Sequence, residues 1–243
     1  MNDIFDYLRN LFNDIKARRY IESCYYDSGA AGKLFENLIN KQLDNKCFAD
    51  FFGIELKVSS PYNSYPITLF SSFPKIYNKS FEDSISYLIT NFGYTCDNGI
   101  KKLSINVKSN KIKYCKSGYG FMLKVSYKWE KIYLCVFYKN KIICTKFYWS
   151  FEQLYEIVEN KLKNLAYISY MQKNINGKKY INYCDMIFYR FKKPTFLIKA
   201  IEDGIISINF NIVLYSLDNI RYHGVNFVIY YKDFSFIYEK INK

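Results

Sequence analysis

The sequence predicts an α+β fold, with a mixed sheet flanked by helices and a second lobe. Three observations support this class. Apolar residues recur at helical spacing near the N-terminus and again in 151–165. From Lys101 to Phe147, apolar and polar residues alternate in short runs, a pattern typical of antiparallel strands. No linker rich in Pro, Gly or Ser interrupts the 243 residues, so we expect two tightly connected lobes, 1–147 and 148–243.

The first third of the chain is expected to contain two helices and two strands. Asp3–Lys16 mixes acidic residues with short apolar groups, which predicts an amphipathic helix and argues against a signal peptide. Gly29–Ile39 opens with small residues and then places apolar residues on one helical face. Ile54–Val58 alternates apolar and charged residues, as a half-buried strand does. A loop at Pro61–Pro66 separates it from a second strand, Ile67–Phe70.

The rest of the chain adds helices and a C-terminal hairpin to the alternating strands. Phe151–Leu165 is predicted to be a helix, and Gly204 ends a shorter helix that begins at Leu197. The further expected elements are a helix at Phe81–Asn91, hairpin strands at Ile205–Tyr215 and Val225–Tyr230 joined by a loop at Ser216–Gly224, and a final helix at Asp233–Lys240.

The stretch from Asp50 to Lys57 carries an Asp-x4-Glu-x-Lys pattern set in an apolar strand. Successive side chains of a strand point to opposite faces, so Glu55 and Lys57 share one face while Ile54 turns to the core. The chain turns just before the strand and can bring the Asp50 carboxylate alongside Glu55. Two carboxylates and the Ile54 carbonyl would form a hard oxygen site for Mg2+, for which Mn2+ can substitute. The Lys57 ammonium could position a water or offset charge on a phosphate, as in a metal-dependent phosphodiesterase.

Each of these residues also has a plainer interpretation. The strand could be an edge strand whose charged face is solvated. The triplets Asp44-Asn45-Lys46 and Glu159-Asn160-Lys161 repeat the acid-x-Lys spacing, but neither is flanked by alternating apolar residues. Glu36 lies off the centre of the apolar stripe of its helix and could reach the strand site. The alternative for Glu36 is an ordinary exposed helix carboxylate.

Together, the Glu-bearing helix and the strand resemble the MvaI/BcnI group of Type II restriction endonucleases, relatives of the mismatch-repair nickase MutH within the PD-(D/E)xK nucleases. Ala49 stands where the family usually has Pro, which is not a chemical participant. Further motifs follow in the family's order at Leu69-Phe70, Tyr148–Phe151, Ala166–Ser169 and Arg221–Phe227. Several motifs in order are far less probable by chance than one.

The resemblance implies a PD-(D/E)xK restriction-endonuclease-like catalytic lobe in 1–147 and a DNA-recognition lobe in 148–243, with DNA in a cleft between them. It implies catalytic roles for Asp50, Glu55, Lys57 and Glu36, and metal ligation by Asp50, Glu55 and the Ile54 carbonyl.

Four residues of the C-terminal hairpin are candidates for DNA contacts. Asn209 and Asn211 stand where the family carries Asp and Arg, and Val228 where it carries Arg. Asn pairs bidentately with adenine, whereas Arg pairs with guanine, so we expect a different site with more A·T. The alternative is a shifted alignment in a stretch rich in Asn, Ile and Tyr. Arg221 could instead clamp a phosphate, and His223 could be a turn residue bonded to backbone.

The composition agrees with a protein that binds nucleic acid. A formal net charge of +13 points to a polyanion, and no apolar stretch of about 18 residues could span a membrane. Seven scattered cysteines without a Cys-x-x-Cys pair suggest reduced thiols in a cytoplasm. A single histidine excludes a multi-His zinc site. The many aromatics fit a strand-rich core better than base stacking.

These expectations combine into one function. The chain is predicted to be a Type II restriction endonuclease that uses Mg2+ to hydrolyse double-stranded DNA at a short (pseudo)palindromic site, leaving 5′-phosphates. A cognate DNA methyltransferase is expected as its genetic partner, and a monomer as its state. The alternatives are a MutH-like repair nickase, a DNA-binding protein that does not cut, and a structure-specific or RNA nuclease.

Overall fold

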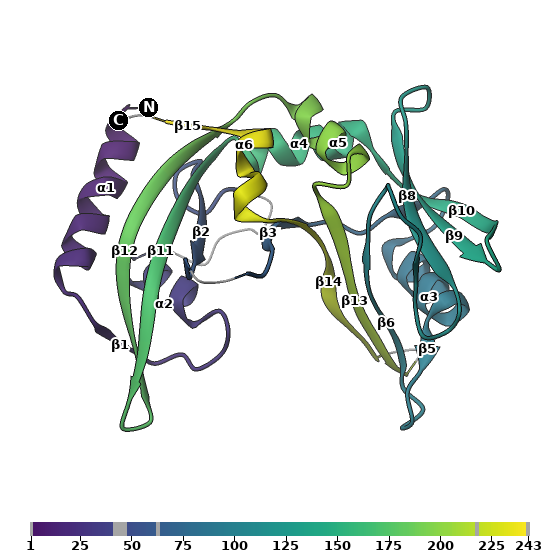
Figure 1. The fold of residues 1–243 in the computed structure, drawn as a ribbon, viewed down its shortest axis with the longest axis horizontal. Helices are drawn as coiled ribbons and strands as arrows, with labels where there is room; N and C mark the ends of the chain where they lie inside the picture. Colours follow the sequence, from purple (N-terminus) through teal and green to yellow (C-terminus); the bar gives the residue numbers. More distant parts are fainter. Residues whose placement is uncertain (1, 41–47, 62–63, 217–218, 242–243) are drawn as a thin grey trace. The chain divides into compact units, whose positions relative to one another are not determined.

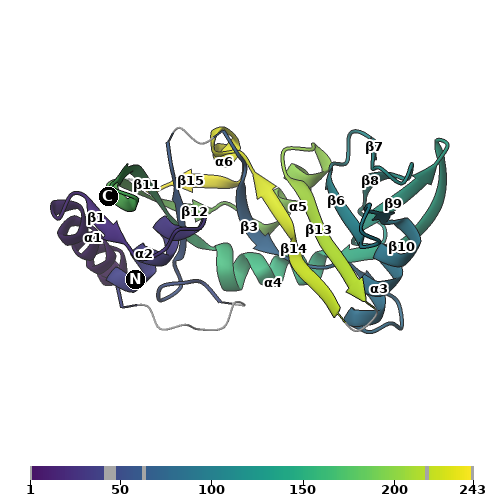
Figure 2. The ribbon, with the colours of Figure 1, turned by 90° about the horizontal axis from the view of Figure 1, so that it is seen from below.

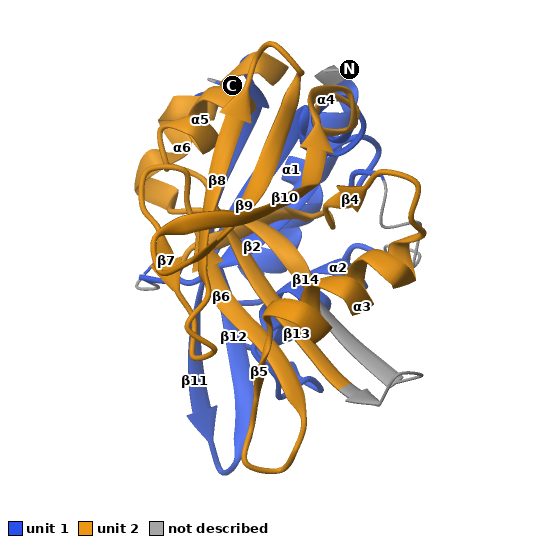
Figure 3. Ribbon diagram, turned by 90° about the vertical axis from the view of Figure 1, so that its right-hand side faces the viewer, with its two compact units in different colours: residues 1–65, 157–192, 238–243 blue, residues 66–156, 193–237 orange. Residues whose placement is uncertain are grey.

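The computed structural model describes residues 2–40, 48–61, 64–216 and 219–241, without the side chains of residues 2 and 215–223. Figure 1 shows the order of the elements along the chain. The chain forms two compact units, each assembled from separate segments (Figure 3). Unit 1 contains Met1–Tyr65, Ile157–Lys192 and Tyr238–Lys243, and unit 2 contains Pro66–Glu156 and Lys193–Ile237.

This division differs from the boundary predicted at residue 147. Unit 1 is completed by strands that come much later in the chain. The strand Asn164–Ile175 pairs with the strand at Glu55–Ser59, and the strands Lys178–Phe191 and Tyr238–Lys240 extend the same sheet from it. The connections between the units are short and the composition is uniform. The sequence therefore does not show where the chain passes from one unit to the other. Both units combine helices with sheets, so the predicted α+β class is confirmed.

Unit 1 is built on one mixed sheet in the order β1-β12-β11-β2, with β15 paired to β12. β2 and β11 run parallel, whereas the other neighbours run antiparallel. The elements of this unit are α1 (Asn2–Ala17), β1 (Ile21–Ser23), α2 (Ala30–Leu38), β2 (Glu55–Ser59), the π-helix η1 (Val158–Leu162), β11 (Asn164–Ile175), β12 (Lys178–Phe191) and β15 (Tyr238–Lys240).

Two helices bury a core against this sheet. α1 packs against β12 and α2 against β2. Phe5 of α1 meets Phe188 of β12 edge to face, and Phe35 of α2 meets Tyr183 of β12, with ring centroids 5.0 Å and 5.2 Å apart. Leu56 of β2 lies in the same core. Because strand side chains alternate, the neighbours of Leu56 on either side turn to the opposite face of the sheet.

A buried hydrogen bond ties α2 to β12, and its loss should be measurable. The Tyr183 hydroxyl donates to the Ala31 carbonyl at 2.7 Å. We expect Tyr183→Phe to lower the free energy of unfolding in urea by about 1 kcal/mol, the typical net value of such a bond. Tyr180→Phe is the matched control, since the Tyr180 hydroxyl donates to the exposed Glu22 carboxylate. Equal stability changes in the two variants would contradict this account.

Unit 2 holds two sheets, in the orders β4-β10-β9-β8-β7 and β3-β14-β13-β6-β5. Figure 2 shows β3, β14, β13 and β6 of the second sheet side by side. The strands are β3 (Ile67–Ser71), β4 (Lys75–Ile76), β5 (Tyr94–Thr95), β6 (Lys101–Val107), β7 (Lys113–Tyr114), β8 (Gly120–Ser126), β9 (Lys131–Tyr138), β10 (Lys141–Ser150), β13 (Ser207–Ser216) and β14 (Asn219–Ile229). The helices are α3 (Phe81–Phe92), α4 (Phe151–Ile157), α5 (Pro194–Glu202), the 3-10 helix η2 (Tyr231–Asp233) and α6 (Phe234–Ile237).

Aromatic rings fill the core of unit 2 between its sheets. Trp149 of β10 is fully buried, and its ring lies 5.5 Å from that of Phe227 on β14 and 6.5 Å from that of Phe210 on β13. The Trp149 indole N–H donates to the Ser72 carbonyl at 3.1 Å, which satisfies its only polar group. Since Phe210 and Phe227 point inward, the residues that alternate with them face away from this core.

Two predicted helices are corrected by the structure. The helix expected over Phe151–Leu165 is α4 followed by the π-helix η1, and the strand β11 already begins at Asn164. Pairing of β11 with both β2 and β12 takes these residues into the sheet. The final helix expected over Asp233–Lys240 is limited to α6, because Tyr238–Lys240 pairs with β12 as β15. In both places sheet hydrogen bonding overrides a helical pattern.

The two strands of the hairpin extend further than expected. β14 begins at Asn219 and pairs with β13 as far as Ser216, so much of the loop predicted at Ser216–Gly224 is strand. α5 begins earlier than Leu197, at Pro194, a residue well suited to the first turn of a helix. The other predicted helices and strands described here lie close to their expected positions.

Among the described helices, none has both the length and the apolar character that a transmembrane span requires. Cys24, Cys96, Cys115, Cys135, Cys144 and Cys184 are free thiols, and Cys47 lies outside the described residues.

Candidate active site

A tight turn brings Asp50 back alongside β2. The backbone N–H groups of Phe51 and Ile54 each donate to the other residue's carbonyl, at 2.9 Å and 2.8 Å. Between them, Phe52 and Gly53 have φ angles of 44° and 85°, the left-handed pair that a type I′ turn requires. Gly53 adopts this angle without cost, whereas Phe52 holds it with its ring 75% exposed. The conformation of this turn therefore fixes the position of Asp50, the residue directly before it.

The predicted Asp, Glu and Lys are brought together at the start of β2. The Asp50 carboxylate accepts the backbone N–H of Leu56 at 3.0 Å, which holds it beside the strand. The Lys57 ammonium lies 2.8 Å from Glu55 Oε1, so the two charges share one face as the alternation predicted. Glu55 is only 2% exposed, and the Lys57 side chain is 17% exposed. β2 does lie at an edge of its sheet, as the plainer interpretation expected, but its charged side chains are not solvated.

A second ammonium, missed from the sequence, reaches the same carboxylate. Lys161 of η1 lies 3.5 Å from Glu55 Oε1. The backbone N–H of Ala49 donates to the Asn160 carbonyl at 3.3 Å, which ties the π-helix to the segment that carries Asp50. The sequence shows the triplet Glu159-Asn160-Lys161, but a π-helix cannot be read from a helical pattern. Such insertions are frequent at functional sites.

Burial dominates the electrostatics of Glu55. Loss of water raises the pKa of the Glu55 carboxyl and Asp50 raises it further, while Lys57 and Lys161 act in the opposite direction. Tyr238 of β15 is 1% exposed, and burial, with a smaller contribution from Glu55, raises the pKa of its hydroxyl well above the usual value. The tyrosine therefore stays protonated, and the carboxylate lies in a strongly desolvated position.

One oxygen of this buried carboxylate is positioned to take a cation. Glu55 Oε2 is buried and has no hydrogen-bond partner among the described residues. A buried, unsatisfied carboxylate oxygen is costly unless something binds it. With Asp50 beside it, the donor set consists of hard oxygens, which suits a small divalent cation. The residues present therefore fit a divalent metal ion.

The protein supplies only part of a coordination shell here. Within the described part of the chain, no three Asp, Glu, His or Cys side chains gather as a metal cage. Mg2+ is usually held by one or two carboxylates together with water and substrate phosphates. The Ile54 carbonyl, the third predicted ligand, accepts the N–H of Phe51, which leaves its second lone pair for a cation.

Glu36 lies on α2, the helix that packs against β2. Its side chain is half-buried, which differs from the fully exposed carboxylate of the plainer interpretation. Its neighbours Leu34 and Phe35 are buried in the core of unit 1 and fix the helix against the sheet.

For the DNA cleavage that the family resemblance implies, the Lys161 ammonium should contribute through Glu55 and the charge of the site. We expect Lys161→Ala to slow this reaction by about tenfold, since one nearby positive charge is removed. Lys163→Ala is the matched control, because Lys163 is exposed and pairs with Glu159 instead. Single-turnover cleavage rates measure both variants. Equal rates in the two would show that Lys161 only fills space beside the strand.

The predicted DNA-contacting residues lie in unit 2. Asn209 and Asn211 are half-buried and point away from the core that contains Phe210. Val228 is only 2% exposed, so its side chain is covered by neighbouring residues. The side chains of Arg221 and His223 lie outside the described residues, although both positions belong to β14.

Comparisons with known proteins agree with one another. The family model described as MvaI/BcnI restriction endonuclease family matches residues 9–238. No curated protein matches the chain. The structure described as "Restriction endonuclease MvaI-cognate DNA substrate complex" has a TM-score of 0.88, with 26% sequence identity over 99% of this chain and 98% of that chain. "Restriction endonuclease MvaI in the absence of DNA" has a TM-score of 0.64 at the same identity and coverage.

Proposed function

Because this chain belongs to the MvaI/BcnI restriction endonuclease family and is a Type II restriction endonuclease acting on DNA, we propose that Asp50, Glu55 and Lys57 form its catalytic centre. Restriction endonucleases generally need a divalent metal ion, and the proposed ion here is Mg2+, for which Mn2+ can substitute. The substrate is double-stranded DNA at a short (pseudo)palindromic site. The observation that carries the proposal is the buried, unpartnered Glu55 Oε2 beside Asp50 and two ammonium groups.

The reaction is hydrolysis of one phosphodiester bond in each strand. A water oxygen bonds to phosphorus, the bond from phosphorus to the 3′-oxygen breaks, and that oxygen takes up a proton. The products are a 5′-phosphate and a free 3′-hydroxyl. Bound Mg2+, held by Asp50, Glu55 and the Ile54 carbonyl, would polarise a phosphoryl oxygen and lower the pKa of a water.

The two lysines act on charge and orientation. Lys57 points along the same face as Glu55, where its ammonium can orient the attacking water or offset negative charge that develops on the phosphate. Lys161, whose ammonium lies near the same Oε1, also offsets the charge of the buried Glu55 carboxylate. Glu36, on the helix packed against β2, is assigned to a supporting or second-metal role.

The proposed partners follow from the reaction. An enzyme that cuts a short site would also cut the DNA of its own cell, so a cognate methyltransferase must mask those sites. We place the enzyme in the cytoplasm, which agrees with the free thiols of the six described cysteines. We propose that it acts as a monomer, cutting the two strands in turn.

The test is digestion of long unmethylated DNA by the purified protein, with Mg2+ and with a chelator. The expected result is a set of discrete fragments that forms only with Mg2+ and whose sequenced ends share one site. Circles nicked in one strand, with no linear product, would favour the MutH-like nickase. DNA that is bound but never cut would overturn the proposal and leave a binding protein.

A further inference from the structure

Polar side chains form one row across four strands of unit 2. Cross-strand pairing places Asn106 of β6 beside Asn209 of β13, Asn209 beside Asn226 of β14, and Asn226 beside Ser71 of β3. All four alternate with core residues such as Phe210, so they lie on the face that points away from the Trp149 core. Neighbouring strands lie about 4.8 Å apart. Neighbouring members of the row are therefore separated by somewhat more than the roughly 3.4 Å between successive base pairs of DNA.

Hydrogen bonds within the row fix two of its amides. The Asn106 side-chain amide donates to Asn209 Oδ1 and, at 2.8 Å, to Ser207 Oγ. The Ser71 hydroxyl donates to Asn226 Oδ1 at 2.5 Å. Each of the two amide oxygens is therefore held by a neighbour and keeps a second lone pair, while its NH2 group remains a donor. An amide fixed in this way presents one donor and one acceptor side by side.

Gly224 leaves space for the side-chain amide of Asn226. Gly224 of β14 has a φ of 105°, which side-chain-bearing residues rarely adopt. A Cβ at this position would stand 2.7 Å from Asn226 Oδ1. The strand therefore has the one residue type that permits both this backbone angle and this amide position.

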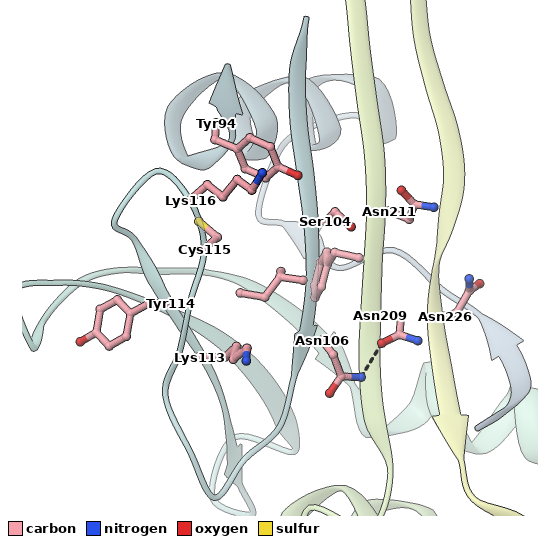
Figure 4. Close-up of a pocket in the computed structure, with 12 residues that line it drawn as sticks. Tyr94, Ser104, Asn106, Lys113, Tyr114, Cys115, Lys116, Asn209, Asn211 and Asn226 are labelled. Atoms are coloured by element: carbon pink, nitrogen blue, oxygen red, sulfur yellow. Dashed lines mark hydrogen bonds between the residues drawn. The ribbon is translucent and has the colours of Figure 1, made fainter. Parts of the chain in front are cut away.

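The row borders a hollow with a volume of about 560 Å3 (Figure 4). Asn106, Asn209 and Asn226 line it, and Lys113 and Lys116 come from the segment around β7 (Figure 4). Among the described residues that line the hollow, none is Arg, Asp or Glu. The hollow thus combines neutral amides with ammonium groups, which suits base edges beside phosphates.

We propose that Asn209 and Asn226 each read one adenine in the major groove, and that Asn106 and Ser71 are positioning residues for them. An asparagine amide donates to adenine N7 and accepts from N6, a match that no other base offers in the major groove. Arg, which pairs with guanine, is absent from the described lining of the hollow, so these positions favour A·T over G·C pairs. The inference rests on the proposed function and names part of its recognition site.

The test selects bound duplexes from a randomised DNA library, using Lys57→Ala protein so that cleavage is not required. The expected motif contains two A·T positions. Adding Asn209→Ala should lower the preference for adenine at one of them by about tenfold or more, and Asn226→Ala at the other. Asn209→Asp should change the preferred base at its position to cytosine, since a carboxylate accepts from cytosine N4.

Two further variants separate reading from positioning. Ser71→Ala should weaken the adenine preference at the Asn226 position without changing the preferred base. Asn91→Ala, on the exposed side of α3, is the matched control and should leave the motif unchanged.

A motif without A·T, no motif at all, or one unaffected by the Asn209 and Asn226 variants would overturn this inference. Failure of wild-type protein to cut DNA would instead count against the proposed function, because binding selection does not depend on cleavage.

Discussion

Glu55→Gln is expected to lower the rate of DNA cleavage by about a thousandfold or more while the fold stays intact. Glutamine has nearly the same shape, so the 2%-exposed site remains filled. It removes the negative charge and the unpartnered oxygen that would hold a cation, and loss of one preorganised electrostatic group in an active site typically costs this much. Single-turnover cleavage at saturating Mg2+ measures the effect.

The same variant should change how stability depends on pH in metal-free protein. Burial raises the pKa of Glu55 above its unfolded value, so the folded state binds more protons than the unfolded state between the two values. Stability contributed by this group is therefore lost as the pH rises through that window. Glutamine does not ionise, so Glu55→Gln does not lose stability as the pH rises. At neutral pH the metal-free variant should therefore melt at a higher temperature than wild type.

Two results would contradict the account of Glu55. One is cleavage by Glu55→Gln at a near wild-type rate. The other is a lower melting temperature at neutral pH in the absence of metal, which would mean that the ion pairs with Lys57 and Lys161 outweigh burial. Glu159→Gln is the matched control, since Glu159 is exposed and pairs with Lys163.

Lys57→Ala is expected to slow cleavage by a hundredfold to a thousandfold, roughly the range for one group that stabilises developing charge. Its ammonium contacts Glu55 Oε1 at 2.8 Å but supplies no cation ligand. The Mg2+ concentration that gives half the maximal rate should therefore change much less than the maximal rate itself. A Mg2+ titration of cleavage separates the two quantities.

The behaviour of Lys57→Arg sharpens this prediction. Arginine keeps the positive charge but replaces a compact ammonium with a wide guanidinium, so it should restore only part of the rate. Full activity in Lys57→Ala would show that Lys161 alone supplies the positive charge of the site, and the role given to Lys57 would be wrong.

Local patterns were sufficient to place the centre of the candidate site. Alternation along β2 predicted that Glu55 and Lys57 share a face and that Leu56 lies in the core, because a strand leaves no other choice. Glycine before the strand predicted a turn, and the turn does bring Asp50 alongside. These features depend only on neighbours within a few residues along the chain.

Contacts with strands that are distant in the sequence could not be predicted from such local patterns. Lys161 reaches Glu55 through a π-helix whose register is fixed by contact with the Asp50 segment, so its triplet looked ordinary. Tyr238 belongs to a strand that forms only by pairing with β12. A helical pattern in the sequence carries no information about such partners.

The proposed recognition surface also depends on residues that are distant in the sequence. Asn209 was predicted from its place in the hairpin, but Asn106 and Asn226 join it only through cross-strand register. Val228, which stands where the family carries Arg, is buried, although its register with β13 puts it on the same face as Asn226. The sequence carries no sign of what covers this position.

Anomalous diffraction from crystals of the wild-type protein grown with Mn2+ and duplex DNA would show directly whether Asp50 and Glu55 hold the metal ion. We expect a manganese peak within about 2.1 Å of Glu55 Oε2 and of an Asp50 carboxylate oxygen, the distance typical of Mg2+ sites. A strongest peak held by other residues, with Glu55 Oε2 still without a ligand, would contradict it.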